Sequence, residues 1–461
     1  MGSGTGGLGD KCAGGFTWGG RLERSVIWLR LFLFGPMWAA MNDQTRRDQD
    51  GAGVATRGAA LRLLDAVLRK GLPLESALDN AARGLERADD RALAHAIAAE
   101  VLRRLPDLDA LIDSATAKPL PPDAKARTAL RIALVQSLQL NTPSHAAIST
   151  VLPLVDGGPR KLVHGVFGTL DRRGAKLPEL PSLPDGVALR WAEAWGAAVV
   201  EAAQHAIAVP PPLDLTLRNG PVEGLEGVSL APGHLRLAAA GRVTELPGFD
   251  DGAFWVQDIS ASLPARLIGT GTGRVLDLCA APGGKTMQLA AAGWDVTAVD
   301  MAAQRLKRVR ENLARTKLKA RLVSGDALTF SDDPYDAVLL DAPCSATGIF
   351  RRHPDVLHRL RPRVIGQMAE RQQAMLARAA GLVKPGGVLV YSVCSLEPQE
   401  GEQVADAFLA SHAGFTLDPI AVHELPAGLT PNAMGQVRVL PGALADQGGA
   451  DGFFVARFRK G

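Results

Sequence analysis

The stretch RVLDLCAAPGGKT, residues 274–286, decides the fold. A largely apolar run is followed by Gly283 and Gly284, and then by a helical pattern. This order predicts a buried strand that turns tightly into a helix. Glycines let the backbone approach a ligand closely, and the first turn of a helix offers unpaired N–H groups to a carboxylate or phosphate. The stretch therefore predicts a loop that binds a nucleotide-like cofactor.

The spacing of these glycines argues against two common loops. It matches neither the G-x-G-x-x-G turn of nicotinamide-dependent oxidoreductases nor the P-loop, which has four residues between its first glycine and Gly-Lys. A loop that cradles phosphates, and an oxidoreductase on a similar sheet, are therefore disfavoured.

Apolar runs and helical patterns alternate downstream of this loop. This alternation predicts a Rossmann-like α/β domain over residues 269–461, doubly wound around a mostly parallel sheet. The expected strands lie at Val275–Cys279, Val296–Val299, Arg321–Val323, Ala337–Leu340 and Val388–Tyr391.

Asp300 and Asp326 end the second and third of these strands. Asp300 lies 23 residues after Asp277, where an acid can bind a ribose diol of the cofactor. The alternative for Asp300 is a solvated carboxylate at a strand end. The same reasoning places Asp326 beside the adenine amino group, and its alternative is an acid that caps a turn.

The rest of the chain divides into three parts. Residues 53–176 show apolar residues three or four apart, which predicts an all-α bundle. A proline- and glycine-punctuated linker near residues 178–186 precedes a small α+β insert at 186–268. We expect residues 1–52 to be unstructured or a mis-assigned start, with Met41 opening the true chain.

Composition narrows the class of protein. The chain has 461 residues and a net charge of only +3, so any charge that binds nucleic acid must be local. Its four cysteines are widely spaced, which argues against disulfides and a metal site and for a reducing compartment. We expect a cytoplasmic monomer that has no membrane span and no metal.

Cys344 and Cys394 follow the fourth and fifth predicted strands. The carboxyl ends of parallel strands form the edge where an open α/β sheet binds its ligands. A scattered cysteine is more often a small buried apolar residue, and that is the alternative here. Methylation of carbon 5 of cytosine requires a thiolate to add at carbon 6, and a second thiol could assist the elimination that follows.

Three segments resemble the Sun family of RNA cytosine-5 methyltransferases. They are DLCAAPGGKT (277–286), LDAPCSATGIFRRHPD (340–355) and YSVCSLEPQEGE (391–402). In front of them, the segments DRALAHAIAAEVLRRLPDLDALI (90–112), RIALVQSLQLNTPSHAAI (131–148) and LVHGVFGTLDRR (162–173) resemble a NusB-like RNA-binding domain. The resemblance extends from about residue 54 to the end.

The resemblance implies an activity and a set of site residues. It implies S-adenosylmethionine as cofactor and RNA as substrate, small-subunit ribosomal RNA above all. Cys394 would attack the base, Cys344 would promote product release, and Asp341 would face both the base and the cofactor. The implied cofactor site consists of Cys279, Ala280, Ala281, Pro282, Gly283, Gly284, Lys285, Asp300, Asp326 and Asp341.

Two other functions stay open at this point. The same chemistry could act on transfer RNA, or the chain could be a catalytically silent RNA-binding factor in ribosome assembly. Seven arginines lie between the two cysteines in the sequence, and we expect them to contact RNA phosphates, with a solvated helix face as the alternative. They are Arg351, Arg352, Arg359, Arg361, Arg363, Arg371 and Arg378.

Overall fold

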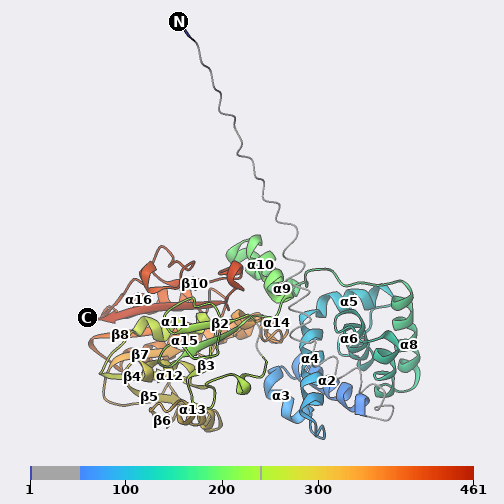
Figure 1. Cartoon of the computed structure of the whole chain (residues 1–461), viewed down its shortest axis with the longest axis horizontal. Coiled ribbons are helices and arrows are strands. Elements are labelled where there is room, and N and C mark those ends of the chain that lie inside the picture. Colours follow the sequence, from blue (N-terminus) through green and yellow to red (C-terminus); the bar gives the residue numbers. More distant parts are fainter. Residues whose placement is uncertain (3–51, 239–240) are drawn as a thin grey trace.

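The computed structural model describes residues 1–2, 52–238 and 241–461. The predictions for residues 1–52 and for a start at Met41 therefore fall almost wholly outside the described residues. Figure 1 shows a helical body and a sheet-containing body side by side, with α9 (Asp185–Trp195) and α10 (Ala197–Ala208) beside the junction. None of the described helices is both long and apolar enough to cross a bilayer.

The helical body confirms the predicted all-α bundle. Its central helix is α6, which is buried from Ala126 to Gln136 and lies among the other helices (Figure 1). Leu64, Ile97 and Leu130 are fully buried in its core. The helices are α2 (Ala52–Leu68), α3 (Leu74–Ala81), α4 (Ala88–Arg103), α5 (Leu105–Ser114), α6 (Lys125–Leu138), α7 (Ser144–Ser149) and α8 (Gly157–Arg172).

The predicted linker is anchored to the bundle. Arg104 donates hydrogen bonds to the carbonyl oxygens of Pro178 and Glu179, and the Ser182 N–H donates to Asp107. After α9 and α10 come a three-stranded antiparallel sheet and helix α11 (Ile259–Ile268). The strands are β1 (Leu213–Leu217), β2 (His234–Leu237) and β3 (Phe254–Val256).

The large sheet confirms the predicted Rossmann-like architecture. Its strand order is β10-β11-β8-β7-β4-β5-β6, and β9 also pairs with β11. Pairing is parallel from β8 to β6, whereas β9, β10 and β11 form an antiparallel edge. The strands are β4 (Arg274–Leu278), β5 (Asp295–Asp300), β6 (Arg321–Ser324), β7 (Tyr335–Asp341), β8 (Val383–Val393), β9 (Phe415–Leu417), β10 (Val437–Val439) and β11 (Phe453–Lys460).

Helices cover both faces of this sheet, which explains why its parallel strands are nearly continuous apolar runs. On one face α15 and α16 bury Met375 and Phe408 against Leu276 and Leu340. On the other, α11 and α12 bury Leu263 and Leu289 in one core with the sheet. The helices of this body are α12 (Gly284–Ala291), α13 (Ala303–Thr316), α14 (Val356–Arg359), α15 (Pro362–Ala380) and α16 (Glu402–Ser411).

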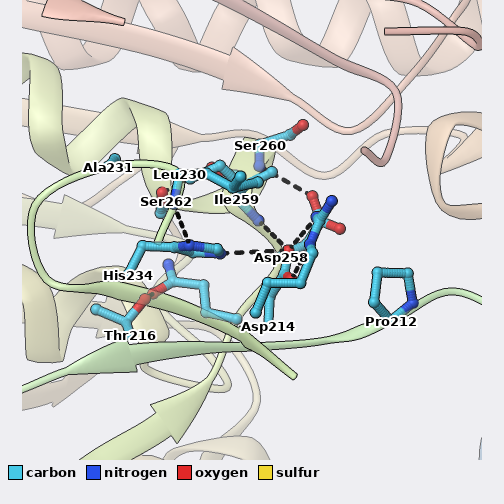
Figure 2. Close-up of polar contacts among 12 residues, drawn as sticks. Pro212, Asp214, Thr216, Leu230, Ala231, His234, Asp258, Ile259, Ser260 and Ser262 are labelled. Carbon is cyan, nitrogen blue, oxygen red and sulfur yellow. Dashed lines mark hydrogen bonds and ion pairs between the residues drawn. The ribbon is translucent and has the colours of Figure 1, made fainter. Parts of the chain in front are cut away.

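A buried polar cluster fixes the small sheet to the start of α11 (Figure 2). Asp214 accepts two hydrogen bonds from Arg236 and a third from the Ile259 N–H, and His234 lies 3.5 Å from the same carboxylate. Asp258 caps α11 by accepting from the Ser260 N–H. Because α11 belongs to the core of the large sheet, this cluster joins the insert firmly to the sheet-containing body.

Candidate active site

The predicted site residues follow one another along the carboxyl edge of the parallel strands. In the order of the sheet, Cys394 follows β8, Asp341 ends β7, Cys279 follows β4, Asp300 ends β5, and Asp326 lies just beyond β6. The chain moves outward from β4 in both directions, so β4 and β7 flank the topological switch point where such sheets bind ligands. The structure thus brings the predicted cofactor loop and the two cysteines to one edge.

The cofactor loop is shaped by Gly283. Its φ of +102° is the left-handed conformation that favours glycine, and an added Cβ would lie 3.0 Å from Val309. α12 begins at the next residue, and the first N–H groups of a helix have no partner within it. Lys285, in the first turn of α12, donates to Asp341 at 2.7 Å and links the loop to β7.

Both predicted acids at the cofactor side accept hydrogen bonds from backbone N–H groups. Asp300 is buried, accepts from the N–H groups of Ala281 and Ala302, and pairs with Arg305 at 2.8 Å. The Asp300 carboxylate therefore connects β5 to the cofactor loop itself. Asp326 accepts from the Leu328 N–H at 3.0 Å, which is the turn-capping alternative considered for it.

Asp277 is fully buried below this loop, and the half-buried Cys279 packs against the same core. Asp277 accepts a hydrogen bond from Thr286, and its other carboxylate oxygen is buried without a partner. Burial raises the pKa of Asp277 to about 7. Burial, with the charges of Asp341 and Asp300, likewise raises the pKa of Cys279 to about 12, so this thiol stays protonated at neutral pH.

The two other cysteines touch each other. The Sγ atoms of Cys344 and Cys394 are 3.5 Å apart, although the residues lie 50 positions apart in the chain. The hydrogen bond to Cys394, together with burial, holds the pKa of the Cys344 thiol well above its usual range. Cys344 therefore keeps its proton at neutral pH, and it lies where it can donate its S–H to the sulfur of Cys394.

Glu400 fixes both cysteine loops, and sequence reasoning did not assign it a role. Its buried carboxylate accepts from the N–H and hydroxyl of Ser345, which follows Cys344, and from the hydroxyl of Ser395, which follows Cys394. Gln372 donates to it at 3.0 Å. The only signal in the sequence was a second acid in the segment that contains Cys394.

Helix α9 holds the loop after Cys394 from the other side. The indole N–H of Trp195 donates to the Leu396 carbonyl at 2.8 Å, and that of Trp191 donates to Glu397. Arg190 pairs with the same glutamate. The two tryptophans are four residues apart and so lie on one helix face, a spacing that was visible in the sequence.

Gly401 makes room for an arginine at the same loop. A Cβ at this position would overlap the guanidinium of Arg438, which pairs with Glu402 and donates to the Ser395 carbonyl. The ring of Trp195 lies 5.2 Å from this guanidinium. Gly401 therefore allows Arg438 to support the backbone beside Cys394.

The prediction that seven arginines contact phosphate is wrong for several of them. Arg351 is buried beside Asp451, and Arg352 pairs with both Asp451 and Asp258. Arg359 pairs with Asp355, and Arg378 donates to the Phe330 carbonyl. These arginines hold the fold together, whereas Arg361 and Arg363 are exposed.

Comparison with known proteins agrees with this arrangement. Residues 267–459 match the family described as 16S rRNA methyltransferase RsmB/F, and residues 54–166 match the NusB family. The chain is 39% identical to ribosomal RNA small subunit methyltransferase B of Xylella fastidiosa, over 88% of this chain and 98% of that protein. The chain belongs to the RsmB/F methyltransferase family.

Further RsmB/F relatives and a solved structure extend this result. The Klebsiella pneumoniae protein of the same name is 35% identical over 88% of this chain and 98% of its own length. The solved structure titled "Crystal Structure of PH0851" shares the fold, with a TM-score of 0.68 and 24% identity over 87% of this chain and 99% of that chain. S-adenosylmethionine is the cofactor of this family, as predicted.

The cofactor loop of this chain offers groups that can bind S-adenosylmethionine. The N–H groups at the start of α12 can bind its carboxylate. Asp300, which was predicted to bind the ribose, is buried, and both of its carboxylate oxygens accept hydrogen bonds within the protein. The unpaired, buried oxygen of Asp277 leaves one further acceptor beneath the loop. No cluster of residues suited to a metal ion occurs in the described part of the chain.

Proposed function

We propose that this chain methylates carbon 5 of a cytosine in ribosomal RNA, with Cys394 as nucleophile and Cys344 as the group that assists product release. The observation that carries the proposal is the 3.5 Å contact between two thiols beside the cofactor loop. The names of the relatives, ribosomal RNA small subunit methyltransferase B, support ribosomal RNA as the substrate.

The chemistry begins at the sulfur of Cys394. Its thiolate adds to carbon 6 of the base, a C–S bond forms, and electron density moves to carbon 5. S-adenosylmethionine, when bound, supplies the methyl group that carbon 5 receives. The proton on carbon 5 is then lost to water, its electron pair restores the ring double bond, and the C–S bond breaks to return the Cys394 thiolate.

Cys344 and Asp341 have separate tasks in this proposal. The Sγ of Cys344 lies 3.5 Å from that of Cys394, so a protonated Cys344 can donate its S–H and stabilise the Cys394 thiolate as it leaves. Asp341, which is held by Lys285 and by Ser392, accepts from the exocyclic amine of cytosine. Uracil has a carbonyl oxygen at that position, so the carboxylate disfavours uracil.

The test compares two variants on an unmodified 16S ribosomal RNA transcript with S-adenosylmethionine. Cys394→Ala should abolish methyl transfer, whereas Cys344→Ala should still attack and accumulate a covalent protein–RNA adduct, visible in a denaturing gel. Wild-type enzyme with fully methylated RNA serves as the control. Methyl transfer by the Cys394→Ala variant would refute the assignment.

The choice of RNA has its own test. Bisulfite sequencing of total RNA from cells with and without the gene should show one or more cytosines that lose methylation, and we expect them in small-subunit ribosomal RNA. Loss confined to transfer RNA would favour the alternative substrate. A chain without measurable affinity for S-adenosylmethionine would instead favour a silent assembly factor.

We further propose that the enzyme acts as a monomer in the cytoplasm. Cys279, Cys344 and Cys394 are free thiols, which supports a reducing compartment. Light scattering coupled to size-exclusion chromatography should give the mass of one chain. A mass of two chains would contradict the monomer.

A further inference from the structure

The most basic stretch of the described chain lies on α13 and just after it. Residues 303–321 contain eight lysines and arginines and one acid, Glu311. Since the whole chain has a net charge of only +3, this density is local. It does not include the arginines near the cysteines, most of which are bound within the protein.

Packing of α13 does not require this charge. Its buried face consists of Leu306, Val309 and Leu313, which lie in one core with Met287 and Trp255. The opposite face of the helix therefore projects into solvent, where a polar residue of either sign would serve the fold equally well.

Some of the basic residues have partners and four do not. Arg305 pairs with Asp300, and Arg315 donates to the Phe249 and Phe254 carbonyls. Among the described residues, no hydrogen bond or ion pair engages the other four, all of which are exposed. This set, called the α13 basic surface below, consists of Arg308, Arg310, Lys317 and Lys319.

The first half of the α13 basic surface, which contains Arg308 and Arg310, lies toward the active site, because α13 starts after β5 at the carboxyl edge of the sheet. Lys317 and Lys319 precede β6 at the amino edge. Asn312 of the same helix donates to the Pro282 carbonyl of the cofactor loop at 3.1 Å. Glu75 of α3 connects Arg308 with the segment that follows Cys344. The hydrogen bond from His95 lowers the pKa of Glu75, and the charges of Arg308 and of His353, which belongs to that segment, lower it further. Arg308 and His353 therefore both lie within electrostatic range of Glu75, which belongs to α3 of the helical bundle.

We infer that the α13 basic surface binds the phosphodiester backbone of the RNA strand whose target base enters the active site. The inference rests on the proposed function. Unpaired lysines and arginines on an exposed face attract phosphates without reading sequence, which positions a strand while other residues select the base. The bound arginines Arg351 and Arg352 are not available for this task.

The test replaces all four residues by glutamine and measures binding of an unmodified 16S ribosomal RNA transcript from about 50 to 200 mM salt. Loss of four phosphate contacts to single-stranded RNA should lower the magnitude of the salt slope by about 3. The dissociation constant should rise at least about tenfold at the lower salt. Affinity for S-adenosylmethionine should stay unchanged, because in the described part of the chain no hydrogen bond or ion pair joins any of the four to the cofactor loop.

A matched pair of double variants provides the control. Arg308→Gln with Arg310→Gln should weaken RNA binding, whereas Lys384→Gln with Arg459→Gln should not. Arg459 is exposed and Lys384 is half-buried, and both lie toward the amino end of β8, whereas the cysteines follow the carboxyl ends of the parallel strands. Equal losses in the two pairs, or an unchanged salt slope in the fourfold variant, would overturn the inference.

Two further readouts keep the outcomes separate. If the fourfold variant lost cofactor affinity, the double variant Lys317→Gln with Lys319→Gln, beyond the end of the helix, would replace it in the salt titration. An unchanged salt slope in that double variant would then count against the inference. If the wild-type chain bound RNA but methylated no cytosine, the proposed function would fail while the salt dependence still tested the α13 basic surface.

Discussion

Glu400 is the residue at which the two halves of the catalytic geometry meet. Its carboxylate receives hydrogen bonds from both cysteine loops, and its charge contributes to the high pKa of Cys344. A neutral residue of the same shape keeps most of these contacts but loses the charge. The pKa of Cys344 should then fall toward its usual range, and its hydrogen bond to Cys394 should become less well fixed.

Glu400→Gln should therefore lower kcat for methyl transfer by about 10- to 100-fold with little change in KM for S-adenosylmethionine. The decisive measurement is the pH profile of Cys344 alkylation by iodoacetamide in the absence of RNA, which should shift to lower pH. Glu397→Gln is the matched control, since Glu397 lies on the same loop but binds Trp191 and Arg190. An unshifted profile in Glu400→Gln would show that the carboxylate serves only to hold the fold.

Single residues differ in how well the sequence predicts them. The positions of Cys344 and Cys394 follow from strand ends, so their meeting at one edge was predictable. The role of Glu400 was not, because its donors come from segments up to 55 residues away. The prediction that Arg352 contacts phosphate was wrong for the same reason, because its partner Asp451 lies 99 residues further along the chain.

At the scale of elements, α9 acts as a support for the loop that carries Cys394. Trp195→Phe keeps an aromatic ring against Arg438 but removes the hydrogen bond to the Leu396 carbonyl. Stability should fall by about 1 kcal/mol, and kcat should fall several-fold because the loop is held less tightly. Urea unfolding and single-turnover kinetics measure the two effects.

Leu189→Ala, on the exposed side of the same helix, should change neither quantity. A Trp195→Phe variant with wild-type kcat would show that α9 packs against the catalytic body without ordering the loop. Stability alone does not distinguish these roles, so the kinetic measurement is the one that decides.

The central strands were easier to predict than the edge. Buried parallel strands are continuous apolar runs, and all five were located from the sequence. The antiparallel edge was not, since β9 and β10 have only three residues each and show no usable alternation. The place of the insert also depended on buried contacts such as Asp214 with the start of α11, which no local pattern reveals.

At the scale of the whole molecule, His358 joins the catalytic body to the helical bundle. Its Nε2 lies 2.7 Å from the Leu102 carbonyl oxygen, to which the neutral ring can donate. Burial lowers the pKa of His358 to about 4, with Arg131 and Asp355 among the nearby charges. The folded protein thus favours the neutral ring, and this stabilisation is present above the unfolded-state pKa near 6.5 and lost as pH falls through about 4.

The free energy of unfolding should therefore fall by about 1–3 kcal/mol from this group alone as the pH drops from about 6.5 to about 4. His358→Gln keeps a donor that does not titrate, so the difference between wild type and variant isolates the imidazole from the carboxylates. Urea unfolding at several pH values measures it. A difference that does not vary with pH would contradict the prediction.

The contact between the bundle and the catalytic body limits how the genes of related proteins can recombine. Segment 351–358, between the two cysteines, makes three hydrogen bonds with the bundle. The Asp355 carboxylate accepts from the Leu74 N–H, and the Arg351 carbonyl accepts from Arg103. The His358 ring lies within hydrogen-bond distance of the Leu102 carbonyl oxygen. In a chimaera in which only residues 52–173 came from a relative, the bundle of the relative would contact segment 351–358 of this chain. Recombination between such genes should therefore give a folded protein when both sides of this contact come from the same parent gene.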